Sequence, residues 1–239
     1  MSSRTITARV AVAAALLPLV AGCSDDEGAK ASGSQPTPSA TEQESLLPNG
    51  VRMLPAPGED SSLVAGRYRV PLDEALAFEI DLPAGSEGDS GGLYLMTPDF
   101  VLKSEVATER YGVASDPCVG DGIAPVGPRV ADLVKAIRRQ PGLKVSRPSP
   151  ATLGSATGMH LRVRIDPAFD VSSCRDHQVN LPGIHGTNNN VSPAYVGEWW
   201  ILDTGGQRVV LQGMCDPCGP EASDRVREVV DTITFTAAS

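Results

Sequence analysis

Alternating apolar and polar positions predict the central strands of a folded domain in the second half of the chain. Met159, Leu161, Val163 and Ile165 alternate with polar residues, the pattern of a strand with one solvated face. Two nearly continuous apolar runs, residues 198–203 and 207–214, flank a Thr-Gly-Gly turn and predict a hairpin of central strands. Further short strands are predicted at residues 67–71, 77–83, 92–96, 106–114 and 232–236.

A helical period replaces the alternation at two places. Apolar residues at 130, 133, 134 and 137 share one face of a helix that ends before a Pro-Gly pair. A second helical stripe lies between residues 222 and 233. Hairpins of strands with segregated helices predict a single α+β domain over residues 51–239, in which an antiparallel sheet packs against two or more helices.

The first residues have the layout of an export signal. Two arginines and no acidic residue precede an apolar run at residues 10–20 that is too short to span a membrane. The run ends in Val20-Ala21-Gly22-Cys23, which resembles the lipobox of bacterial lipoproteins. The resemblance implies that residues 1–22 are a signal peptide. It also implies that Cys23 receives diacylglycerol and palmitate, which would anchor the chain on the extracytoplasmic face of the cell membrane. An ordinary secretory signal, with Cys23 a free thiol, is the alternative.

Residues 23–50 are predicted to be a lipidated, disordered tether. Ser, Thr, Pro, Gly and acidic residues dominate this stretch, and no aromatic residue occurs in it. Such a composition cannot bury enough apolar surface to offset the entropy lost on ordering. As a flexible coil this length spans roughly 30 Å, which would lift the following domain off the membrane surface.

A set of short motifs between Gly66 and Phe235 carries a family resemblance. The motifs are Asp116-Pro117-Cys118, residues 131–137 and 140–145, the strand after residues 154–158, Cys174, and residues 200–203, 208–210 and 229–233. Together they resemble a domain of actinobacterial envelope proteins and lipoproteins that is similar to PsbP-like α/β folds. The resemblance implies an envelope module and transfers no catalytic residue.

The overall charge narrows the choice of ligands. The chain has 20 Lys and Arg against 29 Asp and Glu, a net charge of −9, and removal of two arginines with the signal leaves 18 − 29 = −11. With no run of Lys or Arg, the sequence predicts no affinity for nucleic acid or for anionic headgroups. A lipid, a cell-wall glycan and a protein partner all stay open as the ligand.

Four cysteines are left once Cys23 is acylated, an even number in an oxidising compartment, and three pairings are open. Cys215 and Cys218 form a local C-x-x-C, so we predict that they pair with each other and that Cys118 pairs with Cys174. The C-x-x-C is also similar to thioredoxin-like active sites, but too few residues follow it to complete that fold. A thiol oxidoreductase is therefore an alternative only, and a four-thiol zinc site is disfavoured by export.

A serine motif is the sharpest sign of catalysis in the chain. Gly88-Asp89-Ser90-Gly91-Gly92 matches the nucleophile motif of chymotrypsin-like proteases and also fits G-x-S-x-G. All three histidines follow Ser90, whereas the trypsin-like order places a histidine first. Strand-like residues on both sides favour a plain turn over a strand-to-helix elbow. A secreted hydrolase using Ser90 with His177 or His185 is therefore an alternative function.

The remaining candidates are ligand contacts. His177 and His185 lie in polar loops whose spacing matches no known metal site, so no metal and no cofactor are predicted. Trp199 and Trp200 point to opposite faces of their strand; one is expected in the core, and the other under a helix or in a groove as a ligand platform. Because no catalytic motif fits its context, the sequence predicts a binding or structural domain and not an enzyme.

Overall fold

The computed structural model describes residues 46–59, 61–91, 94–119, 122–184, 189–215 and 221–237. Every described residue belongs to one compact unit, Gln43–Ser239. The predicted signal peptide, Cys23 and most of the predicted tether therefore lie outside the described residues. Among the helices that are described, none combines the length and the apolar character that crossing a bilayer requires.

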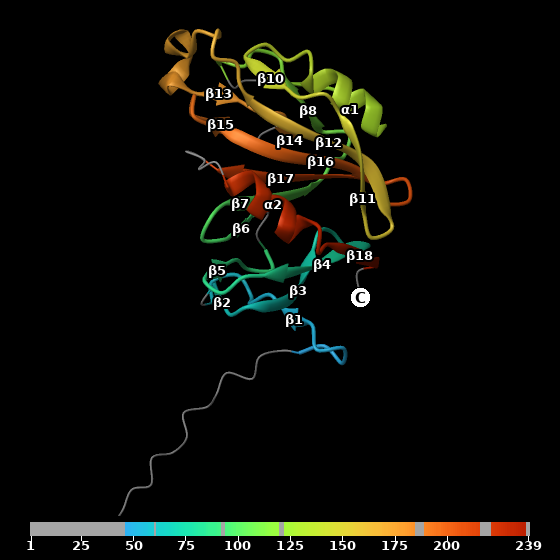
Figure 1. The fold of residues 1–239 in the computed structure, drawn as a ribbon. Helices are drawn as coiled ribbons and strands as arrows, with labels where there is room; N and C mark the ends of the chain where they lie inside the picture. Colours follow the sequence, from blue (N-terminus) through green and yellow to red (C-terminus); the bar gives the residue numbers. More distant parts are fainter. Residues whose placement is uncertain are drawn as a thin grey trace, which may run out of the picture. The chain divides into compact units, whose positions relative to one another are not determined.

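A nine-stranded sheet dominates the Gln43–Ser239 unit (Figure 1). At its centre β16 (Val196–Asp203) and β17 (Arg208–Cys215) form an antiparallel hairpin, so the predicted hairpin of central strands is confirmed. The flanking strands are β12 (Ala156–Ile165), β10 (Leu143–Val145) and β11 (Ser149–Leu153) on one side, and β7 (Val101–Val106), β6 (Tyr94–Met96), β5 (Ser86–Glu87) and β2 (Ser62–Leu63) on the other.

Three smaller sheets and two α-helices complete the fold within the described residues. The first sheet holds β1 (Arg52–Met53), β3 (Gly66–Pro71), β4 (Leu76–Leu82) and β18 (Thr234–Ala237); the second holds β8 (Tyr111–Ala114), β9 (Ile123–Pro125) and β14 (Gly183–Ile184); the third holds β13 (Val179–Asn180) and β15 (Asn190–Val191). The helices are α1 (Val130–Ile137) and α2 (Ala222–Val230), with two 3₁₀ turns, η1 (Val171–Ser173) and η2 (Arg175–His177). Both predicted helices are thus confirmed.

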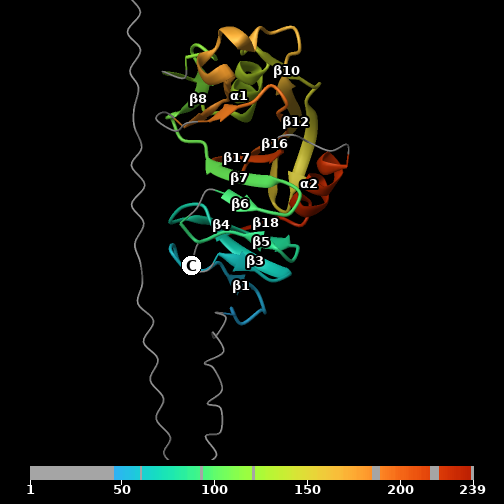
Figure 2. The same ribbon diagram turned by 90° about the vertical axis from the view of Figure 1, so that its left-hand side faces the viewer.

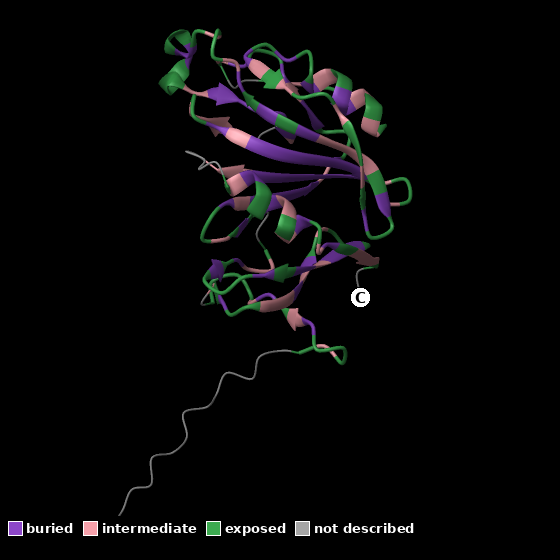
Figure 3. Ribbon diagram, viewed as in Figure 1, coloured by how far each residue is buried: buried purple, intermediate pink, exposed green. Residues whose placement is uncertain are grey.

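Opposite faces of the large sheet enter two separate cores, because successive side chains of a strand point to opposite sides. Figure 3 shows the resulting run of buried residues along the central strands. On one face Trp200 and Leu211 pack with β3, β4 and α2. On the other face Trp199 and Val210 pack with α1 and with the segments around Tyr111. Figure 2 shows the β3–β4 sheet on one side of β7 and β17 and α1 on the other.

Helix α2 approaches the large sheet closely at a glycine. A Cβ atom placed on Gly213 of β17 would lie 2.1 Å from Val226 Cγ1 of α2, so only glycine leaves room for this contact. The apolar stripe of the helix, which includes Val226 and Val230, is buried against the sheet. The local sequence of β17 therefore sets how near α2 can lie.

The predicted α+β fold class is wrong. Strands contain 45% of the described residues and helices only 13%, and the strands form several sheets instead of one. The cause lies in what covers the large sheet. One face is covered by the β3–β4 sheet together with the single helix α2, and much of the other is covered by short strands and irregular segments beside α1. The chain is mostly β, with two short helices.

The predicted strand at residues 106–114 is also wrong in its bounds. Strand β7 ends at Val106 and β8 begins at Tyr111. Between them the chain turns, and the Tyr111 amide donates to the Thr108 carbonyl at 3.0 Å. The apolar residues on the two sides of this turn belong to different sheets, which their spacing along the sequence does not reveal.

Candidate anion-binding edge

Positive charge gathers in one stretch of this acidic chain. Residues 126–165 contain eight Lys and Arg and one acidic residue, Asp132, a balance of 8 − 1 = +7. Arg129 pairs with Asp132 at 3.1 Å. The other seven cations are all exposed: Lys135, Arg138, Arg139, Lys144, Arg147, Arg162 and Arg164. We call these seven residues the basic edge.

The fold brings the basic edge together around the outermost strands of the large sheet. Lys144 of β10 lies directly opposite Arg164 of β12, and Arg162 lies two residues away on the same face. These side chains line a hollow of about 470 Å³ together with Val145, Ser146 and Val196. Cross-strand neighbours lie close enough for their side chains to interact, so one anionic group in this hollow could contact several cations.

A second hollow lies on the opposite face of the same edge. It measures about 470 Å³ and is lined by Lys135 of α1, by Arg138 and Arg139 directly after this helix, and by Met159 of β12. Met159 and Arg162 are three residues apart on one strand, so their side chains point to opposite faces. The basic edge therefore presents cations on both faces of the sheet.

The charges of the basic edge have few internal partners. Only Arg162 approaches a carboxylate, at 3.7 Å from Glu198 Oε1. The other six make no ion pair with any residue that the structure describes. Cations at the end of α1 complement the helix dipole, which accounts for Lys135, Arg138 and Arg139. It does not account for Lys144 opposite Arg164, where like charges directly opposed are unfavourable.

A buried carboxylate fixes the strand that carries part of the basic edge. Glu198 of β16 is 1% exposed and lies 2.7 Å from His160 Nε2 and 3.0 Å from Arg227 Nη2. Burial raises the pKa of Glu198, but hydrogen bonds from His160 and Ser223 and the charge of Arg227 outweigh burial and hold the pKa below its ordinary value. The ionised carboxylate therefore links β12 and β16 to α2.

The two tryptophans point to opposite faces, as predicted, and both are buried. Trp199 has no exposed surface, and its Nε1 donates to the Tyr195 hydroxyl at 2.8 Å. Trp200 is 3% exposed and borders a hollow of about 290 Å³, and its ring packs at a tilt against His160 with 4.9 Å between the ring centroids. Trp199 is thus a core residue, whereas a platform role for Trp200 stays a prediction.

The residues of the hydrolase alternative come from separate elements. Ser90 lies between β5 and β6, where its amide donates to the Pro55 carbonyl at 2.8 Å. His177 lies in η2, after Cys174, and no hydrogen bond joins Ser90 to a histidine in the described part of the chain. His185 lies outside the described residues. Nor do the described residues contain a group of three or more His, Cys, Asp or Glu side chains able to hold a metal ion.

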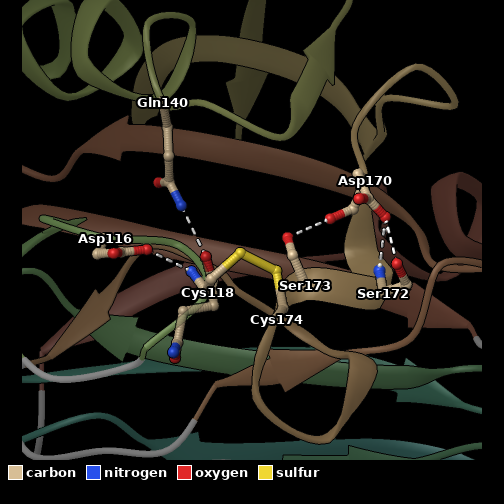
Figure 4. The surroundings of a disulfide bond; sticks show 8 residues. Asp116, Cys118, Gln140, Asp170, Ser172, Ser173 and Cys174 are labelled. Carbon is tan, nitrogen blue, oxygen red and sulfur yellow. Dashed lines mark hydrogen bonds between the residues drawn. A yellow bond between two sulfur atoms is a disulfide. The ribbon is translucent and has the colours of Figure 1, made fainter.

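The predicted disulfide between Cys118 and Cys174 is confirmed, with 4.3 Å between the Cα atoms (Figure 4). Neighbouring hydrogen bonds hold the same segments together: the Arg175 amide donates to the Cys118 carbonyl at 3.1 Å, and Gln140 Nε2 donates to the Asn180 carbonyl at 2.6 Å. Cys215 is disulfide-bonded as well. Cys218 lies outside the described residues, so its pairing with Cys215 stays a prediction.

No protein family, curated protein or solved structure matches the chain. The function must therefore be argued from the geometry of the domain. Sequence reasoning missed the basic edge because it took the charge over the whole chain and searched for a continuous run of Lys and Arg. The net charge counted in a sliding window shorter than the domain would have revealed the basic stretch at residues 126–165.

Proposed function

We propose that the chain is a lipid-anchored protein of the bacterial cell envelope whose folded domain binds an anionic envelope ligand with the basic edge, without catalysing a reaction. One observation carries the binding role: seven exposed cations surround one edge of the sheet in a chain whose net charge is −9. A cluster of one sign attracts oppositely charged ligands and speeds their association.

The chemistry of the basic edge suits carboxylate or phosphate groups. Four of its arginines, Arg138, Arg139, Arg162 and Arg164, border the two hollows, and a guanidinium can donate two parallel hydrogen bonds to either group. Lys144 adds a compact charge beside Arg164. A repeating polymer that carries such groups would engage both faces of the edge at once, which a single small anion could not.

The envelope location rests on three features. The lipobox-like Val20-Ala21-Gly22-Cys23 and the polar stretch after it support a lipid anchor with a tether. The Cys118–Cys174 disulfide is compatible with an oxidising compartment outside the cytoplasm. The resemblance to actinobacterial envelope domains supports the same location, and a bacterial envelope presents abundant anionic polymers to a protein held there.

Binding of the full chain to polyphosphate and to polyglutamate tests the proposal and separates phosphate from carboxylate recognition. Replacing Lys144 and Arg164 with Gln should weaken binding about tenfold or more, with a smaller salt dependence. The control replaces Arg129 and Arg225 with Gln; these residues lie outside the basic edge and the net charge changes equally. Equal losses in both double variants, or no binding to either polymer at low salt, would refute the proposed site.

A further inference from the structure

A buried polar cluster lies on the α1-facing side of the large sheet, away from the basic edge. Lys103 and Glu105 are two residues apart on β7, so their side chains share a face, and they are 1% and 0% exposed. Lys103 Nζ lies 3.0 Å from Glu105 Oε1 and 3.3 Å from Asn189 Oδ1. Asn189, which precedes β15, is 7% exposed. An amine, a carboxyl and a carboxamide therefore meet out of water.

The polar groups beside this cluster are buried as well: Gln212 lies directly opposite Lys103 on β17, and its Nε2 donates to the Tyr111 hydroxyl at 3.1 Å. Tyr111 and Leu181 are completely buried nearby in the same core, and the Tyr94 ring lies 5.6 Å from Lys103 Nζ. Within the described residues Glu105 Oε2 accepts no hydrogen bond. Keeping two opposite charges in such a place carries a large desolvation cost. Burial raises the pKa of Glu105 and so favours its neutral form, while the charge of Lys103 opposes the change.

Hydrogen bonds hold the carboxamide of Asn189 beside Lys103. Its Nδ2 donates to the Pro182 carbonyl at 2.7 Å, and its backbone carbonyl accepts from the Leu181 amide at 3.0 Å. These two bonds fix the side chain with its oxygen 3.3 Å from Lys103 Nζ. Holding two reacting groups together in this way replaces a slow bimolecular encounter by a reaction within the fold.

We propose that Lys103 and Asn189 become joined by an amide bond, with Glu105 as the group that moves the protons. The neutral amine of Lys103 attacks Cγ of Asn189, and the protonated Glu105 donates its proton to the carbonyl oxygen as negative charge develops there. Collapse of the tetrahedral intermediate breaks the Cγ–Nδ2 bond. The nitrogen leaves as ammonia with a proton that Glu105 relays from the attacking amine, and the hydroxyl of the intermediate returns its proton to Glu105 as the carbonyl reforms. One C–N bond forms and one breaks, with no oxidant or reductant.

This bond would be a further covalent link across the domain. It would connect residues 86 positions apart in the sequence and would enclose the segment that contains the Cys118–Cys174 disulfide. It would also convert a buried ion pair into a neutral amide and a neutral carboxylic acid. The proposed bond would cross-link the domain whether or not a ligand binds the basic edge.

Peptide mapping of the full chain after reduction and trypsin digestion tests the bond. We expect a branched peptide in which the segment around Lys103 is joined to the segment around Asn189, lighter than the sum of its parts by one ammonia. Trypsin should fail to cleave after Lys103, because an acylated lysine is not its substrate. Complete cleavage there, with both peptides at their sequence masses, would overturn the proposal without any variant.

Two variants assign the roles. Glu105→Gln should abolish the branched peptide while leaving Lys103 and Asn189 in place, and a branched peptide of undiminished yield would remove Glu105 from the reaction. Lys103→Met should restore the sequence mass of the Asn189 peptide. Loss of ammonia that persists in Lys103→Met would mean cyclisation of the asparagine itself, and would overturn the cross-link.

Discussion

Glu198 shows how one side chain connects elements that are distant in sequence. Its carboxylate contacts His160 on the neighbouring strand and Arg227 on α2, and it is almost completely buried. Hydrogen bonds to a charged group contribute more than those between neutral groups, and a buried charge left without them is costly. The residue therefore contributes to stability only while it is ionised.

Glu198→Gln should lower the free energy of unfolding by about 1–3 kcal/mol at neutral pH. Because the folded-state pKa of Glu198 is depressed, its contribution is present above the unfolded-state pKa and is lost as the pH falls through the folded-state value. The stability of wild type should thus decline in mildly acidic solution more steeply than that of Glu198→Gln. Urea unfolding across the acidic range measures both curves. Glu221→Gln, on an exposed side chain, is the control, and parallel curves for wild type and Glu198→Gln would contradict the argument.

At the residue scale, the sequence predicts the face of the strand to which a side chain points better than it predicts which residues cover that side chain. Alternation along the strand correctly placed Trp199 and Trp200 on opposite faces, since that depends only on local geometry. It could not show that both are buried, because the covering residues come from α2, β4 and the segment around Tyr195. Lys103 and Glu105 went unnoticed for the same reason: a charged pair in a strand is ordinarily solvated, and only the tertiary structure buries it.

At the element scale, the Cys118–Cys174 disulfide ties the loop after β8 to the 3₁₀ turns η1 and η2. Removing it with Cys118→Ala and Cys174→Ala should cost about 4 kcal/mol, because the bridge closes a long loop and restricts the unfolded chain. Denaturant unfolding of the double variant measures this loss. Cys215→Ala with Cys218→Ala is the comparison and should cost less, and equal losses would argue against a local Cys215–Cys218 pair.

Elements with a clear period were predictable, and elements without one were not. The helices and the β16–β17 hairpin carry long apolar patterns, so their residues reveal them. Strands such as β5, β13 and β14 have two residues each, too few to show any alternation. They exist because partner strands elsewhere in the chain satisfy their backbone groups. Of these, β5 belongs to the large sheet, whereas β13 and β14 belong to small sheets that help to cover one of its faces, and the prediction of a single sheet had no place for them.

At the scale of the whole molecule, the proposed lipid anchor and the folded domain belong to different parts of the sequence. If Cys23 carries the lipid, Cys23→Ala should leave the precursor unprocessed, and globomycin should have the same effect on wild type. Immunoblots of membrane fractions separate precursor from mature chain by size. A Lys30→Ala variant, changed within the predicted tether, should be processed normally. Normal processing of Cys23→Ala would leave the ordinary secretory signal as the better interpretation.

Anchoring and binding should also be separable, since Gln43–Ser239 forms a compact unit of its own and contains the whole basic edge. A chain that begins at Gln43 should have a free energy of unfolding within about 0.5 kcal/mol of that of the chain that begins at Cys23. The composition of the residues between these two positions cannot support apolar burial, so their removal should cost little. The chain that begins at Gln43 should bind polyphosphate with unchanged affinity and should no longer partition with membranes. Detergent-phase partition and polymer titration of the two chains provide the comparison. A loss of polymer binding on truncation would place part of the binding site before Gln43, and a loss of stability would mean that the preceding residues pack against the domain.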